Sequence, residues 1–148
     1  MTRIRVAAGL LFNESNDVFM AQRPKTSRRP GLWEFPGGKY EASDGSLVKT
    51  LAREWKEELG VIVDEKQVHR VTTIDLFVEE HFEVNLLQLK LTADSPAPEP
   101  HEAQDIVWAN MAWSVMHRPL VPSCYLFYRH VMDLIRKREN LRTWNRKP

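Results

Sequence analysis

The sequence has one cysteine, Cys124, so no disulfide can form within the chain. A single cysteine in 148 residues is typical of a reducing compartment, and we expect a cytoplasmic location. Histidine and cysteine nowhere show the spacing of a zinc site. No apolar run has the length that a membrane span or a signal peptide requires. We therefore expect neither a zinc module nor a membrane partner.

The chain also lacks a strong charge of either sign. Its 21 Lys and Arg against 20 Asp and Glu leave a formal net charge of +1. This balance gives no support for a broad nucleic-acid surface, and we expect no stable nucleic-acid partner. Hydrophobic residues make up 43% and charged residues 28%, which is ordinary for a globular protein. The length predicts a single domain over residues 1–148, as a monomer or a homodimer.

A helix is predicted over residues 47–59. Leu47, Leu51, Trp55 and Leu59 recur every four residues and form one apolar face. Gly60 follows as a C-terminal cap, a position where positive φ is often needed.

Acidic residues are concentrated at the wrong end of this helix. Glu54, Glu57 and Glu58 lie in its last turns, where the helix dipole disfavours each anion by roughly 0.3–1 kcal/mol. Their spacing also puts them on one face, with repulsion of roughly 0.2–0.5 kcal/mol per pair. A divalent cation bound there reverses the sign of both penalties. The cluster therefore predicts a metal site, and its oxygen ligands favour Mg²⁺ or Mn²⁺.

The segment resembles the Nudix box, G-x5-E-x7-R-E-u-x-E-E-x-G-u, where u is aliphatic. The matching residues are Gly38, Arg53, Glu54, Glu57, Glu58, Gly60 and Val61. Two differences concern the start of the pattern: Asp44 replaces its first Glu, and eight residues instead of seven separate it from Arg53. A third is the large Trp55 at the first aliphatic position. The register within the helix is intact, so the extra residue is expected in the preceding loop.

The resemblance implies an α/β fold, the Nudix α/β/α sandwich with a mixed sheet. It implies that Glu54, Glu57 and Glu58 bind the metal ions, with the Gly38 carbonyl as a further ligand. Arg53 would orient a glutamate by a charge-assisted hydrogen bond. The metal would neutralise phosphates and lower the pKa of a bound water.

An additional acid from a late loop serves as ligand or base in some Nudix proteins. Glu102, shortly before the tryptophan of a predicted strand, matches that position by local pattern. The alternative is that Glu99, Glu102 and Asp105 are simply acidic loop residues.

The flanking sequence is similar to that of MutT-like enzymes, which hydrolyse nucleoside triphosphates. By this likeness, Arg23 would contact the phosphates or the sugar and Phe35 would line the base pocket. The alternatives are a surface arginine and a core phenylalanine. Cys124 lies where these enzymes carry an Asn or Asp that reads the base edge, and Ser123 is its alternative. A thiol is a weak hydrogen-bonding group, so guanine recognition through Cys124 would be poor.

The leading hypothesis is a metal-dependent pyrophosphohydrolase of (deoxy)nucleoside triphosphates, including oxidised ones such as 8-oxo-dGTP. The products would be a nucleoside monophosphate and pyrophosphate. Two alternatives stay open. One is a Nudix hydrolase of RNA 5′ ends, dinucleoside polyphosphates or nucleotide sugars. The other is a nucleotide-binding Nudix module without catalysis.

Outside the acidic helix, the pattern predicts several further elements. A hairpin is expected from residues 4–12 and 18–22, and strands at 68–78, 82–91 and 106–108. A helical turn is expected at 112–116, and a last helix from Pro122 through Ile135 that ends in a basic, poorly patterned segment. Arg28 and Arg29 are expected at a solvated loop tip.

Overall fold

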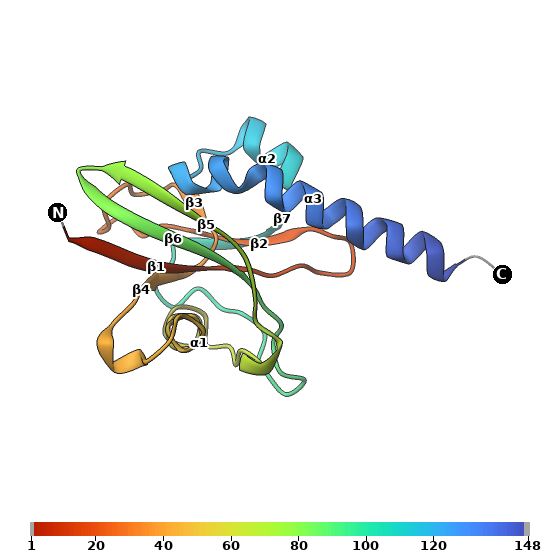
Figure 1. Ribbon diagram of the computed structural model, residues 1–148, viewed down its shortest axis with the longest axis horizontal. Helices are drawn as coiled ribbons and strands as arrows, with labels where there is room; N and C mark the ends of the chain where they lie inside the picture. Colours follow the sequence, from red (N-terminus) through yellow and green to blue (C-terminus); the bar gives the residue numbers. More distant parts are fainter. Residues whose placement is uncertain (1, 147–148) are drawn as a thin grey trace.

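The computed structural model describes residues 2–146 and arranges them in three layers (Figure 1). Two β-sheets form the middle layer. Helix α1 (Leu47–Leu59) covers one side, and α2 (Met111–His117) with α3 (Pro122–Asn145) covers the other. This is the predicted α/β/α sandwich. None of the helices described in residues 2–146 is long and apolar enough to span a membrane.

The larger sheet is mixed, as predicted. Its order is β4 (Gly37–Lys39), β1 (Arg3–Leu10), β6 (Glu80–Gln88) and β5 (His69–Val78). Strands β1 and β6 run parallel, and the other pairs are antiparallel. The second sheet is antiparallel, in the order β3 (Trp33–Glu34), β2 (Val18–Gln22) and β7 (Asp105–Ala109). Short 3₁₀ turns, η1 (Ala42–Asp44) and η2 (Glu65–Gln67), flank α1.

The predicted hairpin of residues 4–12 and 18–22 is wrong in its pairing. Both strands exist, but β1 has β4 on one edge and β6 on the other, so neither edge is left for β2. Only the bridge between Phe12 and Val18 joins the two segments before the chain enters the second sheet. The turn itself is as expected, because the Asn13 side chain accepts hydrogen bonds from the amides of Ser15 and Asp17 at 3.0 Å.

The last helix continues into its basic end, as expected. It runs ten residues beyond Ile135, through the basic segment that lacks an apolar pattern, to Asn145. Arg138 holds this extension to the body: its Nε donates to Asn16 Oδ1 at 2.8 Å, and its guanidinium lies 4.5 Å from the Phe12 ring centroid. Polar and cation–π contacts therefore replace the apolar pattern on which the prediction relied.

Two hydrophobic clusters fill the spaces between the layers. In β6, Val84 and Leu86 belong to the cluster under α3, whereas Leu87 belongs to the cluster under α1. Sheet residues alternate between faces, so one strand supplies both cores. This sandwiching fixes α1, and with it the acidic residues, against the larger sheet.

Trp55 anchors α1 from within the second cluster. The side chain is fully buried, and its indole Nε1 donates to the Pro36 carbonyl at 2.7 Å. The same carbonyl accepts from the Gly9 amide at 2.8 Å. A Cβ on Gly9 would lie 2.5 Å from the indole nitrogen, so the large residue at this aliphatic position is accommodated by a glycine opposite it.

Replacing Gly9 by alanine is expected to lower the free energy of unfolding by about 1–3 kcal/mol, because the indole has no room to move. Urea denaturation followed by far-UV circular dichroism measures this loss. The same change in a Trp55→Leu background should cost clearly less, because the clash is absent. Additive effects of the two substitutions would contradict this account.

Candidate active site

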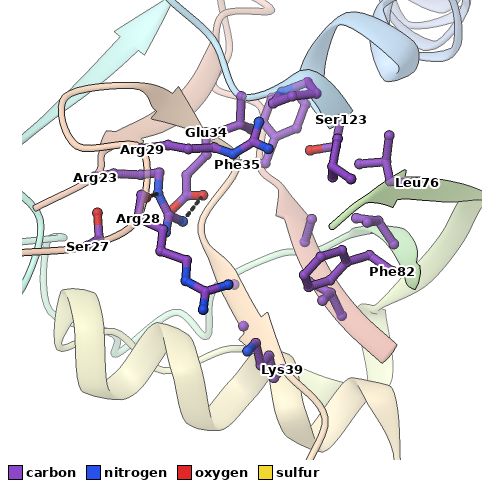
Figure 2. A pocket seen from close by; sticks show the side chains of 18 of the residues that line it. Arg23, Ser27, Arg28, Arg29, Glu34, Phe35, Lys39, Leu76, Phe82 and Ser123 are labelled. Atoms are coloured by element: carbon purple, nitrogen blue, oxygen red, sulfur yellow. Dashed lines mark hydrogen bonds and ion pairs between the residues drawn. The ribbon is translucent and has the colours of Figure 1, made fainter. Parts of the chain in front are cut away.

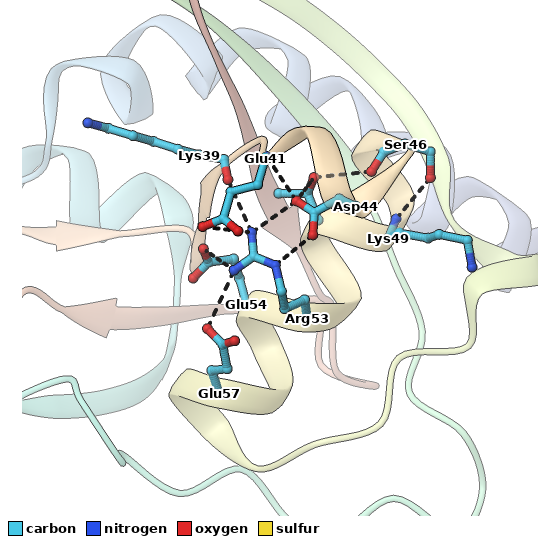
Figure 3. A network of polar contacts seen from close by, with 9 residues as sticks. Lys39, Glu41, Asp44, Ser46, Lys49, Arg53, Glu54 and Glu57 are labelled. Carbon is cyan, nitrogen blue, oxygen red and sulfur yellow. Dashed lines mark hydrogen bonds and ion pairs between the residues drawn. The ribbon is translucent and has the colours of Figure 1, made fainter.

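Arg53 is the centre of a polar network on α1 (Figure 3). Its Nε donates to Asp44 Oδ1 at 2.7 Å, and its Nη2 donates to Asp44 Oδ2 at 3.0 Å. Its Nη1 donates to Glu54 at 2.9 Å and to Glu57 at 3.5 Å, and Nη2 also reaches the Lys39 carbonyl at 3.2 Å. One guanidinium thus fixes the loop before the helix and two of the predicted metal-binding acids. The predicted orienting role of Arg53 matches this geometry.

Asp44 has a role that the sequence pattern left open. It ends η1, where its Oδ2 accepts hydrogen bonds from the Glu41 amide at 3.0 Å and the Thr50 hydroxyl at 2.8 Å. Gly45 follows at φ +81°, which turns the chain into α1. The loop has one residue more than the Nudix pattern, and it makes a tight turn at Gly45. This turn brings Asp44, whose side chain is shorter than that of the Glu in the pattern, back to Arg53.

Asp44 and Arg53 each stabilise the charged form of the other. Hydrogen bonds from Arg53 lower the pKa of Asp44, despite the opposing effect of burial. Conversely, the hydrogen bond to Asp44 raises the pKa of Arg53. The Asp44 side chain is only 5% exposed, so the pair forms a bidentate, largely water-excluded contact.

The other acids of the helix face crowd one another. Burial raises the pKa of Glu54, despite its hydrogen bond to Arg53. Burial, together with the negative charges of Glu34 and Glu54, raises the pKa of Glu58 to about 9. Two negative charges side by side on Glu54 and Glu58 are therefore disfavoured. The site holds more negative charge than its own cations balance.

The loop before β7 brings Glu102 to this cluster. The amides of Glu99 and His101 donate to the carbonyls of Leu59 and Glu58, each at 3.0 Å, and so attach the loop to the C-terminal end of α1. From there the charge of Glu102 contributes to the raised pKa of Glu58. The late acid predicted from sequence thus lies beside the helix acids.

These side chains fit a hard divalent cation in their chemistry. All the donors are oxygens, and a cation would relieve the repulsion between Glu54 and Glu58. Gly38 lies directly against Glu54: a Cβ there would come within 2.3 Å of the Glu54 carboxyl carbon, so a larger residue would displace that carboxyl. Within residues 2–146, however, no three Asp, Glu, His or Cys side chains already converge on one ion position.

A cavity of about 590 Å³ opens beside the acids (Figure 2). One wall is apolar, with Leu76 and Phe82 from the β5–β6 pair. The opposite wall is charged, with Arg23 and Arg28 from the loop after β2. Gly38 lines the cavity and also touches Glu54, so it joins the cavity to the acidic helix face.

Three of the four predicted substrate-binding residues line this cavity, namely Arg23, Phe35 and Ser123. The fourth, Cys124, does not. Its side chain is 1% exposed and packed in the core under α3, and burial raises the pKa of its thiol to about 12. The prediction for Cys124 is corrected accordingly: Ser123, one residue earlier, faces the cavity. Successive side chains of an α-helix are rotated by about 100° about its axis, which suffices to turn Ser123 to the cavity and Cys124 to the core.

Sequence reasoning also missed cavity residues. Arg28 and Arg29 line the cavity and do not merely form a solvated tip, and Arg28 lies 3.8 Å from Glu79 on the opposite rim. Glu34 pairs with Arg23 at 2.9 Å, and burial raises the pKa of its carboxyl. One sequence signal could have identified Glu34 as a cavity residue: it is a charged residue between two aromatic ones, Trp33 and Phe35, in a short extended segment.

Comparison with known proteins agrees with this arrangement. Residues 1–130 match the NUDIX domain. The chain belongs to the NUDIX family. Together with the relatives described next, this makes it a MutT-like Nudix hydrolase.

Two curated relatives illustrate the match. An 8-oxo-dGTP diphosphatase of Proteus vulgaris is 44% identical over 61 residues, which are 41% of this chain and 54% of that protein. The chain therefore matches about half the length of that relative. A CTP pyrophosphohydrolase of Escherichia coli is 30% identical over 83% of this chain and 87% of its own.

Solved structures share the fold across most of the chain. The solution structure of the E. coli ORF135 protein gives a TM-score of 0.74 at 30% identity, covering 90% of this chain and 91% of that one. A MutT structure from work on Aliivibrio salmonicida and Vibrio cholerae gives 0.72 at 25% identity, covering 90% and 99%. The shared fold thus extends well beyond the acidic helix.

Replacing Asp44 by asparagine is expected to lower kcat by about 10–100-fold. Arg53 would lose the ion pair with Asp44 that fixes its guanidinium, and would then hold Glu54 less firmly. The substitution should also lower the melting temperature. Since the folded pKa of Asp44 is depressed, its stabilisation is present above about pH 4 and fades as pH falls towards the folded pKa. The gap in melting temperature between wild type and variant should therefore narrow below about pH 4.

Thr50→Val, which removes a single hydrogen bond to the same carboxylate, serves as the graded comparison. Thr50→Val should lower kcat and the melting temperature, each by less than Asp44→Asn does. A gap in melting temperature that stays constant from pH 7 to about pH 3 would contradict the ionic role of Asp44.

Proposed function

We propose that this Nudix hydrolase cleaves (deoxy)nucleoside triphosphates, including oxidised ones such as 8-oxo-dGTP, to a nucleoside monophosphate and pyrophosphate with Mg²⁺ or Mn²⁺. The observation that carries the proposal is the position of Gly38. It connects a half-apolar, half-cationic cavity with a row of mutually repelling carboxylates on α1. A ligand with a flat apolar end and a polyanionic end fits this combination.

The charged wall would receive the phosphates. Arg23 is held in place by the half-buried Glu34 at 2.9 Å, so its guanidinium is oriented before a substrate arrives, whereas Arg28 is only loosely paired with the exposed Glu79. A phosphate oxygen can take the place of Glu79 at little cost, because the two side chains of that pair are 79% and 83% exposed. The triphosphate would thereby extend from the cavity towards Gly38.

The acidic face would hold the metal through Glu54, Glu57, Glu58 and the Gly38 carbonyl. When bound, the ion supplies charge neutralisation and a water of lowered pKa as nucleophile. The chain itself supplies orientation: Arg53 holds Glu54 and Glu57 at 2.9 and 3.5 Å. Glu102 would serve as a further ligand or as the base for the attacking water.

The base would lie against the apolar wall, where Phe35, Leu76 and Phe82 provide a hydrophobic surface. Ser123 offers one hydroxyl, which both donates and accepts, so it reads a base edge less strictly than an amide or a carboxylate does. The names of the relatives point to cytidine and to oxidised guanine nucleotides. We therefore expect both among the substrates.

The test is a magnesium-dependent assay of pyrophosphate release over a panel of unmodified and oxidised (d)NTPs, with dinucleoside polyphosphates, a nucleotide sugar and 5′-triphosphate RNA alongside. We expect pyrophosphate release from CTP, dCTP and 8-oxo-dGTP, and none in EDTA. Cleavage confined to RNA would assign the site to RNA 5′ ends. Nucleotide binding without cleavage would make the protein a binding module.

Glu57→Gln is expected to lower kcat by at least about 100-fold, since a metal ligand outweighs a residue that only orients one. The metal-free melting temperature should stay unchanged or rise slightly, because Glu57 is 53% exposed and its removal reduces repulsion. Thermal denaturation with and without Mg²⁺ measures this, and Mg²⁺ should stabilise the wild type more than the variant.

Glu65→Gln is the matched control. Glu65, in η2, is likewise half exposed, at 47%. It pairs with one basic side chain, that of Lys49, at 3.4 Å. This variant should keep full activity. A marked loss of metal-free stability in Glu57→Gln, or equal losses of activity in the two variants, would contradict the metal-site assignment.

A further inference from the structure

An unusual surface lies on α2 and the first turn of α3, across the sheets from α1 (Figure 1). Large apolar side chains are exposed there: Trp113 at 51%, Met116 at 78%, Tyr125 at 46% and Leu126 at 51%. Residues 106–132 contain neither Asp nor Glu. We call these four side chains, with His117, Arg118 and Arg129, the α2–α3 surface.

Planar groups are stacked in succession on this surface. The guanidinium of Arg118 lies between two indoles, 5.1 Å from the centroid of Trp33 and 5.0 Å from that of Trp113. The Trp113 ring in turn lies 4.8 Å from the ring of His117. The series Trp33, Arg118, Trp113, His117 therefore holds one cation between two indoles and ends in a tilted pair of aromatic rings.

The stack is fixed to the body but its charge is not neutralised. The Tyr125 hydroxyl accepts from the Leu120 amide at 3.3 Å and donates to the Arg118 carbonyl at 3.4 Å. Within residues 2–146, neither Arg118 nor Arg129 has a carboxylate within ion-pair distance. Arg129 follows Tyr125 by four residues and so lies on the same face of α3.

We propose that the α2–α3 surface binds single-stranded nucleic acid. The exposed His117 ring at the end of this series can stack on a nucleobase, and arginines without carboxylate partners attract phosphates. Proteins that bind single strands without sequence preference combine these two features. This is a second site, and it does not depend on which nucleotide the cavity hydrolyses.

A second copy of the chain suits this surface less well. A symmetric dimer through the surface would set Arg118 and Arg129 against the same unpaired cations of the other copy, and like charges at an interface are costly. A negatively charged partner has no such penalty.

The net charge of +1 does not oppose the proposal, because the charges are segregated. Asp133 and Glu139 are the only two of the chain's 20 acidic residues that come after residue 105. Acids accumulate around α1, on the opposite side of the sheets. The net charge, on which the expectation of no nucleic-acid partner was based, sums over an acidic surface around α1 and a basic surface on α2 and α3.

The experiment measures fluorescence anisotropy of fluorescein-labelled oligothymidine and oligouridine of about 15 nucleotides, in about 50 and 200 mM NaCl. We expect binding that weakens with salt. Trp113→Ala should weaken it about tenfold or more, and Trp113→Phe should restore much of the loss. Arg118→Gln should weaken binding and reduce its dependence on salt.

Met116→Ala is the matched control, since Met116 lies on the same surface and is the most exposed of its apolar side chains but has no ring and no charge. It should leave oligonucleotide binding unchanged. All variants should keep wild-type melting temperatures and nucleotide hydrolysis, which shows that they are folded and separates this site from the cavity.

Three results would overturn the proposal. The first is no oligonucleotide binding in 50 mM NaCl. The second is an equal loss in Met116→Ala and Trp113→Ala, which would mark a generic apolar surface. The third is a dimer, seen by sedimentation equilibrium, that dissociates in both Met116→Ala and Trp113→Ala. That result would assign the surface to a second copy of the chain.

Discussion

The bidentate contact between Arg53 and Asp44 is the constraint on which the rest of the site depends. It ties the loop that follows β4 to the middle of α1, so the two segments that present Gly38 and Glu54 keep a fixed separation. The remaining Nη1 of the same guanidinium aligns the glutamates. Acids that repel one another adopt an ordered row only when something holds them, and here one arginine does so.

Packing supports this constraint from the other side of the helix. Trp55 and Arg53 are two positions apart on α1, so one points into the core and the other towards the acids. The indole holds the Pro36 carbonyl, which immediately precedes the glycine pair. Both faces of α1 therefore act on the same short segment, one by a buried hydrogen bond and the other by ion pairs. This explains how a large aromatic residue fits at an aliphatic position without shifting the register of the helix.

Much of this could be predicted because it follows from local pattern. The limits of α1, its Gly60 cap and the acidic cluster result from helical periodicity and the dipole, which involve only near neighbours in the chain. The assignment of β1 and β2 to different sheets could not be predicted, since it depends on which strands compete for the edges of β1. The contact that holds the basic end of α3 could not be predicted, because Arg138 bonds to Asn16 across 122 residues of sequence. Ser123 lines the cavity whereas Cys124, the next residue, is buried in the core under α3, and a family pattern cannot resolve a single position at the start of a helix.

The Asp44 turn also bears on how such a site changes over time. Relative to the Nudix pattern, the side chain is shorter by one methylene and the backbone is longer by one residue, and the two differences offset each other at Arg53. With both differences present, the guanidinium still has its bidentate partner. Catalytic motifs that seem to tolerate insertions can thus conserve a contact and not a spacing.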